Sequence, residues 1–451
     1  MKLWDRKSFT EEKILAFTTG MDPVYDMELS PYDVIGSMAH AIMLGESGLL
    51  TRQEASTLVE ELSGLLSLAQ EGELKLREGV EDIHSQVELM LTQQLGDLGK
   101  KIHTGRSRND QVMLDIKLFL RDQIREIFLL AGDLGTELTE KASRYRETGM
   151  PGYTHMQVAM PSSFGLWFGA FAEALADDME YLKGIYRLVN QNPLGSAAGF
   201  GSSFPVDRQL TTRLLGFEGL HISSVNAQLN RGKAEWYTAT GIAAIAATLS
   251  KLAMDMVLYM GQNFRFLKLP DEMTTGSSVM PHKKNPDVLE LIRARCNRLT
   301  GLPAEISAVT GNLTSGYHRD FQILKESIHP ALGSIRSCLD MMSYTVGQVE
   351  VNPAILEEGI YEYIWSVEDV NEKVKSGIPF RDAYREIADE IDKGRYRRGR
   401  EHTYTHLGSI GNPGLNEIRA KLERASDGFR FADTGEIASA LSNYFKKSHD
   451  T

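Results

Sequence analysis

The run GSSVMPHKKNPD at residues 276–287 places hydroxyl groups and cations together in one short segment. Pro281 and Pro286 bracket it, so we expect a loop here rather than a continuous helix or strand. Residues 288–299 have the pattern of a helix whose N-terminus would face the loop, and such a terminus favours an anion. The segment therefore predicts chemistry on an anionic substrate. An ordinary surface loop before a helix is the competing interpretation.

A second polar cluster, HTGRSRNDQ at residues 103–111, stands directly before a long helical pattern. The guanidinium groups of Arg106 and Arg108 would lie at a helix N-terminus with the Ser107 hydroxyl and the Asn109 amide. Such a set of donors suits the binding of carboxylates. The alternative is a capped helix start with solvated arginines. Nucleic-acid binding is disfavoured, because the chain is acidic and no aromatic residues alternate with these arginines.

Three further polar clusters follow: GYTHMQ at 152–157, NPLGSAAGFG at 192–201 and YHRDFQILK at 317–325. His155 would lie in a loop, flanked by polar groups that could fix its tautomer. No pair of histidines has the spacing of a zinc site on a predicted helix, so we expect no metal. The glycine-rich cluster has neither the order of a dinucleotide site nor a preceding strand. Gln322 and Lys325 are three residues apart and can share a helix face.

The composition is that of a soluble globular protein. The 451 residues carry 49 basic and 61 acidic side chains, a net charge of −12. The overall charge therefore does not attract the chain to nucleic acid or to an anionic membrane. Cys296 and Cys338 are the only cysteines, which fits a reducing compartment. The charged N-terminus lacks an apolar core of signal-peptide length, and we expect a cytoplasmic protein without a membrane span.

The polar clusters are separated by long amphipathic segments. Apolar residues keep helical spacing over residues 111–146, 162–190 and 227–259, which predicts rods of roughly 50 Å. Shorter helical patterns cover residues 31–44, 52–70, 286–306 and 332–349. Sustained alternation typical of strands is nearly absent, so the predicted class is all-α. Helices of this length need partners, and their wide apolar faces predict a bundle within an oligomer.

The patterns divide the chain into three predicted helical domains. These are an N-terminal domain at 1–105, a central long-helix domain with the polar loop at 106–355, and a small C-terminal domain at 356–451.

Taken together, the clusters resemble those of the argininosuccinate lyase family, within the fumarase and aspartase superfamily. The resemblance extends to about residue 355; GSSVMPHKKNP is the superfamily signature, and HTGRSRNDQ and YHRDFQILK are similar to the versions in this family. It implies three helical domains and a homotetramer whose central helices form a twenty-helix bundle. Each active site would gather segments from three subunits, and no cofactor would be required.

The resemblance also implies an activity, the reversible anti elimination of argininosuccinate to L-arginine and fumarate in arginine biosynthesis. Ser277 matches the base, Lys283 the group that stabilises the aci-carboxylate, His155 the acid or a relay, and Glu290 the carboxylate that pairs with this histidine. The positions that match substrate contacts are Asp26, Ser107, Arg108, Asn109, Thr154, Asn285, Tyr317, Gln322 and Lys325.

Two positions depart from the common family pattern. Asp22 stands where many relatives have serine, and a second carboxylate there could bind the amino-acid end of the substrate. His282 stands where most argininosuccinate lyases have glutamine and adenylosuccinate lyases often have histidine. An adenylosuccinate lyase is therefore one alternative. A catalytically silent, crystallin-like relative is the other, although the catalytic residues are all retained.

Overall fold

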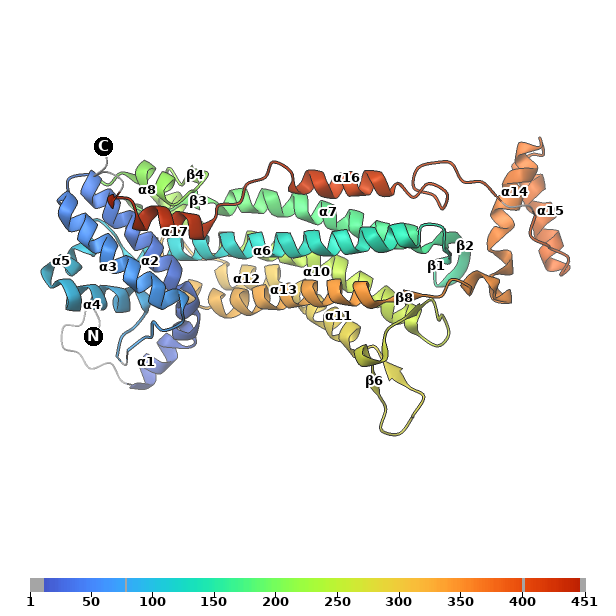
Figure 1. Ribbon diagram of the computed structural model, residues 1–451, viewed down its shortest axis with the longest axis horizontal. Helices are drawn as coiled ribbons and strands as arrows, with labels where there is room; N and C mark the ends of the chain where they lie inside the picture. The colour runs from blue at the N-terminus through green and yellow to red at the C-terminus, as the bar shows by residue number, and fades with distance from the viewer. Residues whose placement is uncertain (1–11, 78, 400–401, 447–451) are drawn as a thin grey trace.

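The computed structural model describes residues 12–77, 79–399 and 402–446 (Figure 1). Helices make up 66% of the chain, and the strands form short two-stranded pairs. The predicted all-α class is therefore confirmed.

The centre of the molecule is a bundle of long helices that run along one axis (Figure 1). Its helices are α6 (Arg108–Arg144), α7 (Phe164–Val189), α10 (Lys233–Met260), α11 (Asp287–Leu299), α12 (Leu302–Thr310) and α13 (Leu324–Gln348). Apolar residues of α6 recur three and four positions apart, and Leu120, Ile124 and Ile127 are completely buried. This face packs against α7 and α13. With 37 residues, α6 spans about 55 Å.

A second hydrophobic core lies at one end of the bundle, built largely by the N-terminal helices (Figure 1). These are α1 (Glu12–Thr19), α2 (Asp22–Glu46), α3 (Arg52–Gln70), α4 (Ile83–Leu95) and α5 (Asp97–Lys100). Leu58 and Leu62 of α3 belong to this core together with Ile42 of α2. A capping box between Thr51 and Glu54 fixes the start of α3.

The C-terminal part of the chain contacts three regions of the molecule. Helices α14 (Ser366–Lys375) and α15 (Phe380–Asp392) lie at the far end of the bundle, around a small core of their own (Figure 1). The chain then returns: α16 (Leu415–Ser426) packs on α6 and α7, and α17 (Thr434–Ser442) packs on α2 and α3. The three domain boundaries given above stay a prediction.

The short elements connect these helices. The strand pairs are β1 (Gly149–Thr154) with β2 (Gln157–Ser163), β3 (Gln191–Asn192) with β4 (Gly219–Leu220), β5 (Leu267–Lys268) with β8 (Glu350–Val351), and β6 (Thr275–Gly276) with β7 (Lys284–Asn285). All are antiparallel except β3 with β4. The remaining helices are α8 (Arg208–Leu214), α9 (Ser224–Leu229) and the 3₁₀ turns η1 (Lys101–His103), η2 (Asp271–Met273), η3 (Arg319–Gln322), η4 (Ile355–Glu357) and η5 (Gly359–Trp365).

Helix α10 exposes an apolar face. Among the described residues it is the one helix long and apolar enough to cross a membrane, and 44% of its most apolar window is buried within this chain. The inner helix of a bundle has the same composition. Trp236, Ala247 and Met254 share one face at helical spacing, and Trp236 and Met254 are 36% and 45% exposed. This face has no cover within the described chain.

Candidate active site

A cavity of about 470 Å³ opens between the N-terminal helices and the adjoining end of the bundle. Six of the predicted substrate-binding residues line it: Asp26, Ser107, Arg108, Tyr317, Gln322 and Lys325. They come from α2, the start of α6 and the segment 317–325. The predictions made from separate motifs therefore converge on one cavity, which we call the N-terminal cavity.

A buried lysine joins two carboxylates in the wall of this cavity. Lys325 Nζ lies 2.6 Å from Asp26 Oδ1 and 3.0 Å from Asp22 Oδ1. Burial opposes the charge on Lys325, but Asp26 and Asp22 outweigh it and raise the pKa of the lysine. Burial raises the pKa of Asp22 against the opposing effect of Lys325. The wall thus presents a fixed cation between two carboxylates.

The start of α6 supplies the basic side of the cavity. Ser107 caps the helix, its hydroxyl accepting from the backbone N–H of Asn109 at 3.3 Å. Arg108 donates to Asp82 Oδ1 at 2.5 Å and to Ser85 Oγ at 3.2 Å. The guanidinium is therefore held at the cavity edge by the start of α4. Asn109 lies in the first turn of α6 but is not among the lining residues.

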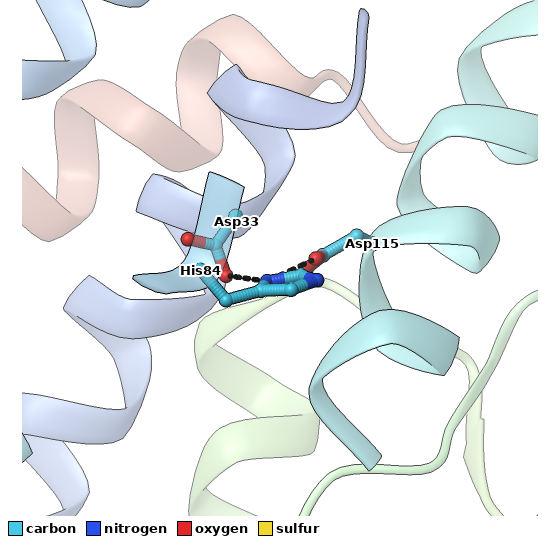
Figure 2. A group of neighbouring side chains, drawn as sticks. All are labelled: Asp33, His84 and Asp115. Atoms are coloured by element: carbon cyan, nitrogen blue, oxygen red, sulfur yellow. Dashed lines mark hydrogen bonds and ion pairs between the residues drawn. The ribbon is translucent and has the colours of Figure 1, made fainter. Parts of the chain in front are cut away.

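A buried polar group lies behind the cavity, where α2, α4 and α6 meet (Figure 2). His84 Nδ1 is 2.9 Å from Asp33 Oδ1 and 3.4 Å from Asp115 Oδ2, and Gln111 donates to Asp33 at 2.6 Å. Burial opposes ionisation of Asp33, but His84 and Arg106 outweigh it and lower the pKa of Asp33. Burial and the charge of Asp33 raise the pKa of Asp115 well above its usual range. The surroundings thus favour the ionised form of Asp33 and disfavour that of Asp115.

The three ligand atoms of this group lie within 4.8 Å of one another, a spacing that a metal ion could bridge. Positive charge is already supplied by Arg106, which acts on both carboxyl groups. We therefore treat the group as an ionic network that joins α4 to α2 and α6. The expectation of no metal stays a prediction.

This assignment predicts unequal effects of two similar substitutions. Asp115→Asn removes a carboxyl group whose ionised form is disfavoured by burial and by Asp33, and it should change the free energy of unfolding by about 1 kcal/mol or less. Asp33→Asn leaves His84 and Gln111 without a carboxylate acceptor and should cost about 3 kcal/mol. Thermal unfolding of both variants at pH 7 measures the difference. Equal losses of Tm would contradict the assignment.

Thr154 and His155, two of the predicted site residues, lie at the tip of the β1–β2 hairpin. Thr154 pairs with Gln157, so His155 and Met156 form a two-residue turn. Their φ angles of 53° and 59° are left-handed, a conformation that non-glycine residues seldom adopt. The turn exposes His155 to solvent. The predicted loop position of His155 is thus confirmed, although it projects from a hairpin rather than from an irregular segment.

The signature loop is a hairpin closed by β6 and β7. Thr275 pairs with Asn285 and Gly276 with Lys284. At the base of the turn, the Ser277 hydroxyl accepts from the backbone N–H groups of Val279 at 3.3 Å and Met280 at 3.1 Å. Two amide donors on one oxygen would stabilise a negative charge there. This geometry is compatible with the base role predicted for Ser277, which stays a prediction.

The remaining predicted residues of this region line a second cavity of about 670 Å³ beside the signature loop. Lys283, Asn285 and Glu290 belong to its lining. Lys283 and Glu290 are exposed, and Asn285 donates to the Thr275 hydroxyl at 3.4 Å. The cavity is open to solvent along the loop.

The three groups of predicted residues do not meet within one chain. The N-terminal cavity adjoins the start of α6, whereas the β1–β2 hairpin follows its far end, about 55 Å away. Figure 1 shows β1, β2 and the β6 loop away from α2 and α4. In particular, the structure does not bring His155 and Glu290 together as an ion pair. A complete site would need segments from more than one copy of the chain.

Several cavity residues were not predicted from the sequence. They are Thr19, Glu81, Asp82, His84, Ser85, His103, Val112, Arg231 and Arg319. The acidic pair Glu81-Asp82 before a helical segment was a usable signal, since Asp82 caps α4. Arg231 gave no such signal, because it lies in the turn between α9 and α10, within a segment that the sequence predicts as one continuous helix.

Comparison with known proteins supports these observations. Residues 10–301 match the protein family described as Lyase. The argininosuccinate lyase of Parabacteroides distasonis is 51% identical over 440 residues, which cover 98% of this chain and 99% of that protein. The argininosuccinate lyase of Bacteroides fragilis is 52% identical over 430 residues, covering 95% and 96%. That of Thermotoga neapolitana is 38% identical over 392 residues, covering 87% and 98%.

Solved structures support the fold. The structure described as EDDS lyase in complex with formate has a TM-score of 0.74 at 23% identity, covering 98% of this chain and 94% of that one. A class II fumarase from Schistosoma mansoni has a TM-score of 0.68 at 15% identity, covering 92% and 95%. Since the family match covers more than half of the chain and about half of all residues are shared with full-length relatives, the chain belongs to the argininosuccinate lyase family of the fumarase and aspartase superfamily.

Proposed function

We propose that the protein is a carbon–nitrogen lyase that cleaves argininosuccinate reversibly to L-arginine and fumarate in arginine biosynthesis. One observation carries this proposal: about half of the residues are identical to those of several argininosuccinate lyases, over nearly the full length of the chain. Six predicted substrate-binding residues gathered around one cavity support it. The same relatives favour this activity over that of an adenylosuccinate lyase, which His282 had kept as an alternative.

The first step needs a base for a weakly acidic C–H bond beside a carboxylate. Ser277 is our candidate, because its oxygen already accepts from two backbone N–H groups that would stabilise an alkoxide. Closure of the loop over substrate would exclude water and strengthen these interactions. Lys283 and Asn285 would stabilise the doubly charged aci-carboxylate that forms. The elimination needs no cofactor.

The second step needs a proton for the departing guanidino nitrogen. His155 is the proposed acid or relay, and Glu290 is its proposed partner. Both side chains are exposed within the single chain. Their role therefore depends on a contact between subunits, and hydrogen bonding from Glu290 would orient the imidazole.

We infer that the active protein is a homotetramer with shared active sites. Two observations support this inference. The N-terminal cavity and the His155 hairpin adjoin opposite ends of α6, and the apolar face of α10 with Trp236 and Met254 lacks cover among the described residues. Antiparallel packing of such faces between copies would bury them and bring one end of a bundle beside the other end of the next. Further apolar residues exposed on α13, Met341 and Tyr344, would extend the interface.

The remaining expectations belong to the same proposal. The chain is acidic overall, and Arg108, Arg231, Arg319 and Lys325 line a small cavity, which suits a small anionic substrate rather than nucleic acid or a membrane surface. We place the protein in the cytoplasm, where a reducing environment would keep the buried Cys296 and Cys338 as thiols.

We expect the purified protein to release fumarate from argininosuccinate and not from adenylosuccinate. Ultraviolet absorbance of fumarate follows either reaction directly. Release from adenylosuccinate alone would move the activity to purine chemistry. A folded protein that is inactive on both compounds would favour the silent, crystallin-like alternative.

A further inference from the structure

The glycine-rich cluster at 192–201 binds a carboxylate of α6. Asp110 is completely buried, and its Oδ2 accepts from the backbone N–H groups of Gly195 at 2.9 Å and Ala197 at 2.8 Å. The other oxygen, Oδ1, accepts from the backbone N–H of Ser107 at 3.0 Å. One carboxylate therefore joins the start of α6 to a turn that begins 85 residues further along the chain.

The backbone of this turn is shaped to hold an anion. Gly195 and Ala197 have φ angles of 81° and 52°, and their N–H groups converge on one oxygen as in an anion-binding nest. On the other side of the turn, Arg208 of α8 donates to the carbonyl of Leu194 at 3.0 Å and to that of His221 at 2.8 Å. The turn is thus held between a buried carboxylate and a guanidinium.

Asp110 lies in the first turn of α6 with Arg108, and Ser107 caps this turn. Both Ser107 and Arg108 line the N-terminal cavity, whereas Asp110 does not. We propose that Asp110 is a positioning residue for substrate binding, which fastens the start of α6 to the glycine-rich turn and keeps Ser107 and Arg108 in place at the cavity wall. The inference rests on the proposed function. A displacement of about 1 Å in a binding group can weaken its contacts by an order of magnitude or more.

The charge of Asp110 gives this role a pH dependence. The charged groups that act on it are Arg106, from the segment before α6, and Arg208, from α8. Burial raises the pKa of Asp110 to about 6, against the opposing effects of the three N–H groups and of Arg106. As the pH falls through this value, one oxygen becomes a donor and no longer matches a backbone N–H. The part of the substrate affinity that depends on Asp110 should therefore be present above pH 6 and lost below it.

The test measures argininosuccinate binding by calorimetry in a Ser277→Ala background, which lacks the proposed base and should bind the substrate without cleaving it. At pH 7.5 we expect Asp110→Asn in this background to weaken binding about 10-fold, because an amide replaces a charged acceptor of three N–H groups. At pH 5 the difference should shrink to about 2-fold, because the parent's Asp110 is then largely protonated. In the cleaving enzyme, Asp110→Asn should raise KM more than it lowers kcat, since Ser277 and Lys283 lie in another loop.

Two glycines of the same cluster provide a matched pair of variants that leave Asp110 unchanged. A Cβ at Gly195 would lie 2.7 Å from Cγ of Arg208, so Gly195→Ala should displace the N–H that binds Asp110 and weaken substrate binding about 10-fold. Gly201 has a similar φ of 79°, but its N–H donates to the carbonyl of Ser196, and a Cβ there would meet its nearest neighbour at 3.5 Å. Gly201→Ala carries the same backbone strain and should change the affinity about 2-fold or less.

The outcomes separate this inference from the proposed function. A wild-type protein that does not cleave argininosuccinate overturns the proposed function and the inference with it. If the wild type cleaves argininosuccinate, unchanged binding in Asp110→Asn, or a loss of the same size at both pH values, overturns the inference alone. If Asp110→Asn does not fold, the glycine pair decides: equal effects of Gly195→Ala and Gly201→Ala would mean that the contact with Asp110 does not position the cavity wall.

Discussion

Replacement of Ser277 by alanine is expected to lower the turnover of argininosuccinate by about 1000-fold or more. The variant removes the oxygen on which the Val279 and Met280 N–H groups converge, and with it the proposed base. The side chain lies in an exposed hairpin loop and contributes nothing to a hydrophobic core. Folding and assembly should therefore be unchanged. Initial rates of fumarate release at saturating substrate, with the mass of the assembly in solution, measure both.

Ser278→Ala is the matched control for this variant. It removes a hydroxyl from the adjacent residue of the same loop, and we expect it to keep most of the activity. Near-normal turnover by Ser277→Ala, together with a large loss in Ser278→Ala, would transfer the role of base to Ser278. Substrate binding provides a second check: Ser277→Ala should still bind argininosuccinate, because the residues that line the N-terminal cavity are unchanged.

The long helices could be predicted closely wherever local signals and burial agree. The predicted helix at 52–70 coincides with α3, because the capping box at Thr51 and the apolar spacing specify the same segment. The predicted rod at 162–190 differs from α7 (Phe164–Val189) by no more than two residues at either end. In these segments the apolar residues that recur at helical spacing in the sequence are the residues that the helix buries.

Prolines and glycines account for most of the errors in the helices. The predicted helices at 31–44 and 332–349 start near a proline, whereas α2 and α13 continue through Pro31 and Pro330. Packing on both sides outweighs the lost backbone hydrogen bond there. The predicted rod at 227–259 is instead interrupted at Gly232, whose φ of 76° separates α9 from α10. The β1–β2 hairpin was not predicted, because its sequence shows no regular alternation.

The residues of the candidate site could be predicted far better than their arrangement. The motifs identified Asp26 and Lys325, which lie almost 300 positions apart and form one buried ion pair. Arg231 was missed, because its importance comes from the missing hydrogen-bond partners and from the rings of Tyr317 and Phe321, which only the fold brings together. No local pattern could show that the signature loop and the N-terminal cavity belong to opposite parts of the molecule.

This separation leads to a second large expected effect. Arg108→Gln removes a carboxylate-binding group from the N-terminal cavity, and Ser277→Ala removes the proposed base. Each variant should be nearly inactive alone. When the two variants are co-expressed with different tags, a site with the loop of one subunit and the cavity of another can be intact. With random assembly, about a quarter of the sites combine an unaltered loop with an unaltered cavity. We therefore expect recovery to about a quarter of wild-type turnover in mixed tetramers.

A pair of variants within one loop provides the control. Ser277 and Lys283 lie in the same β6–β7 hairpin, so a subunit that supplies one of them also supplies the other. Co-expression of Ser277→Ala with Lys283→Ala should accordingly restore nothing, because every loop in the mixture carries one defect. Absence of recovery with Arg108→Gln would mean that loop and cavity come from the same subunit, and recovery in the control would mean that Ser277 and Lys283 of one loop serve different sites. The contrast between the two mixtures tests the sharing of sites independently of the size of either single loss.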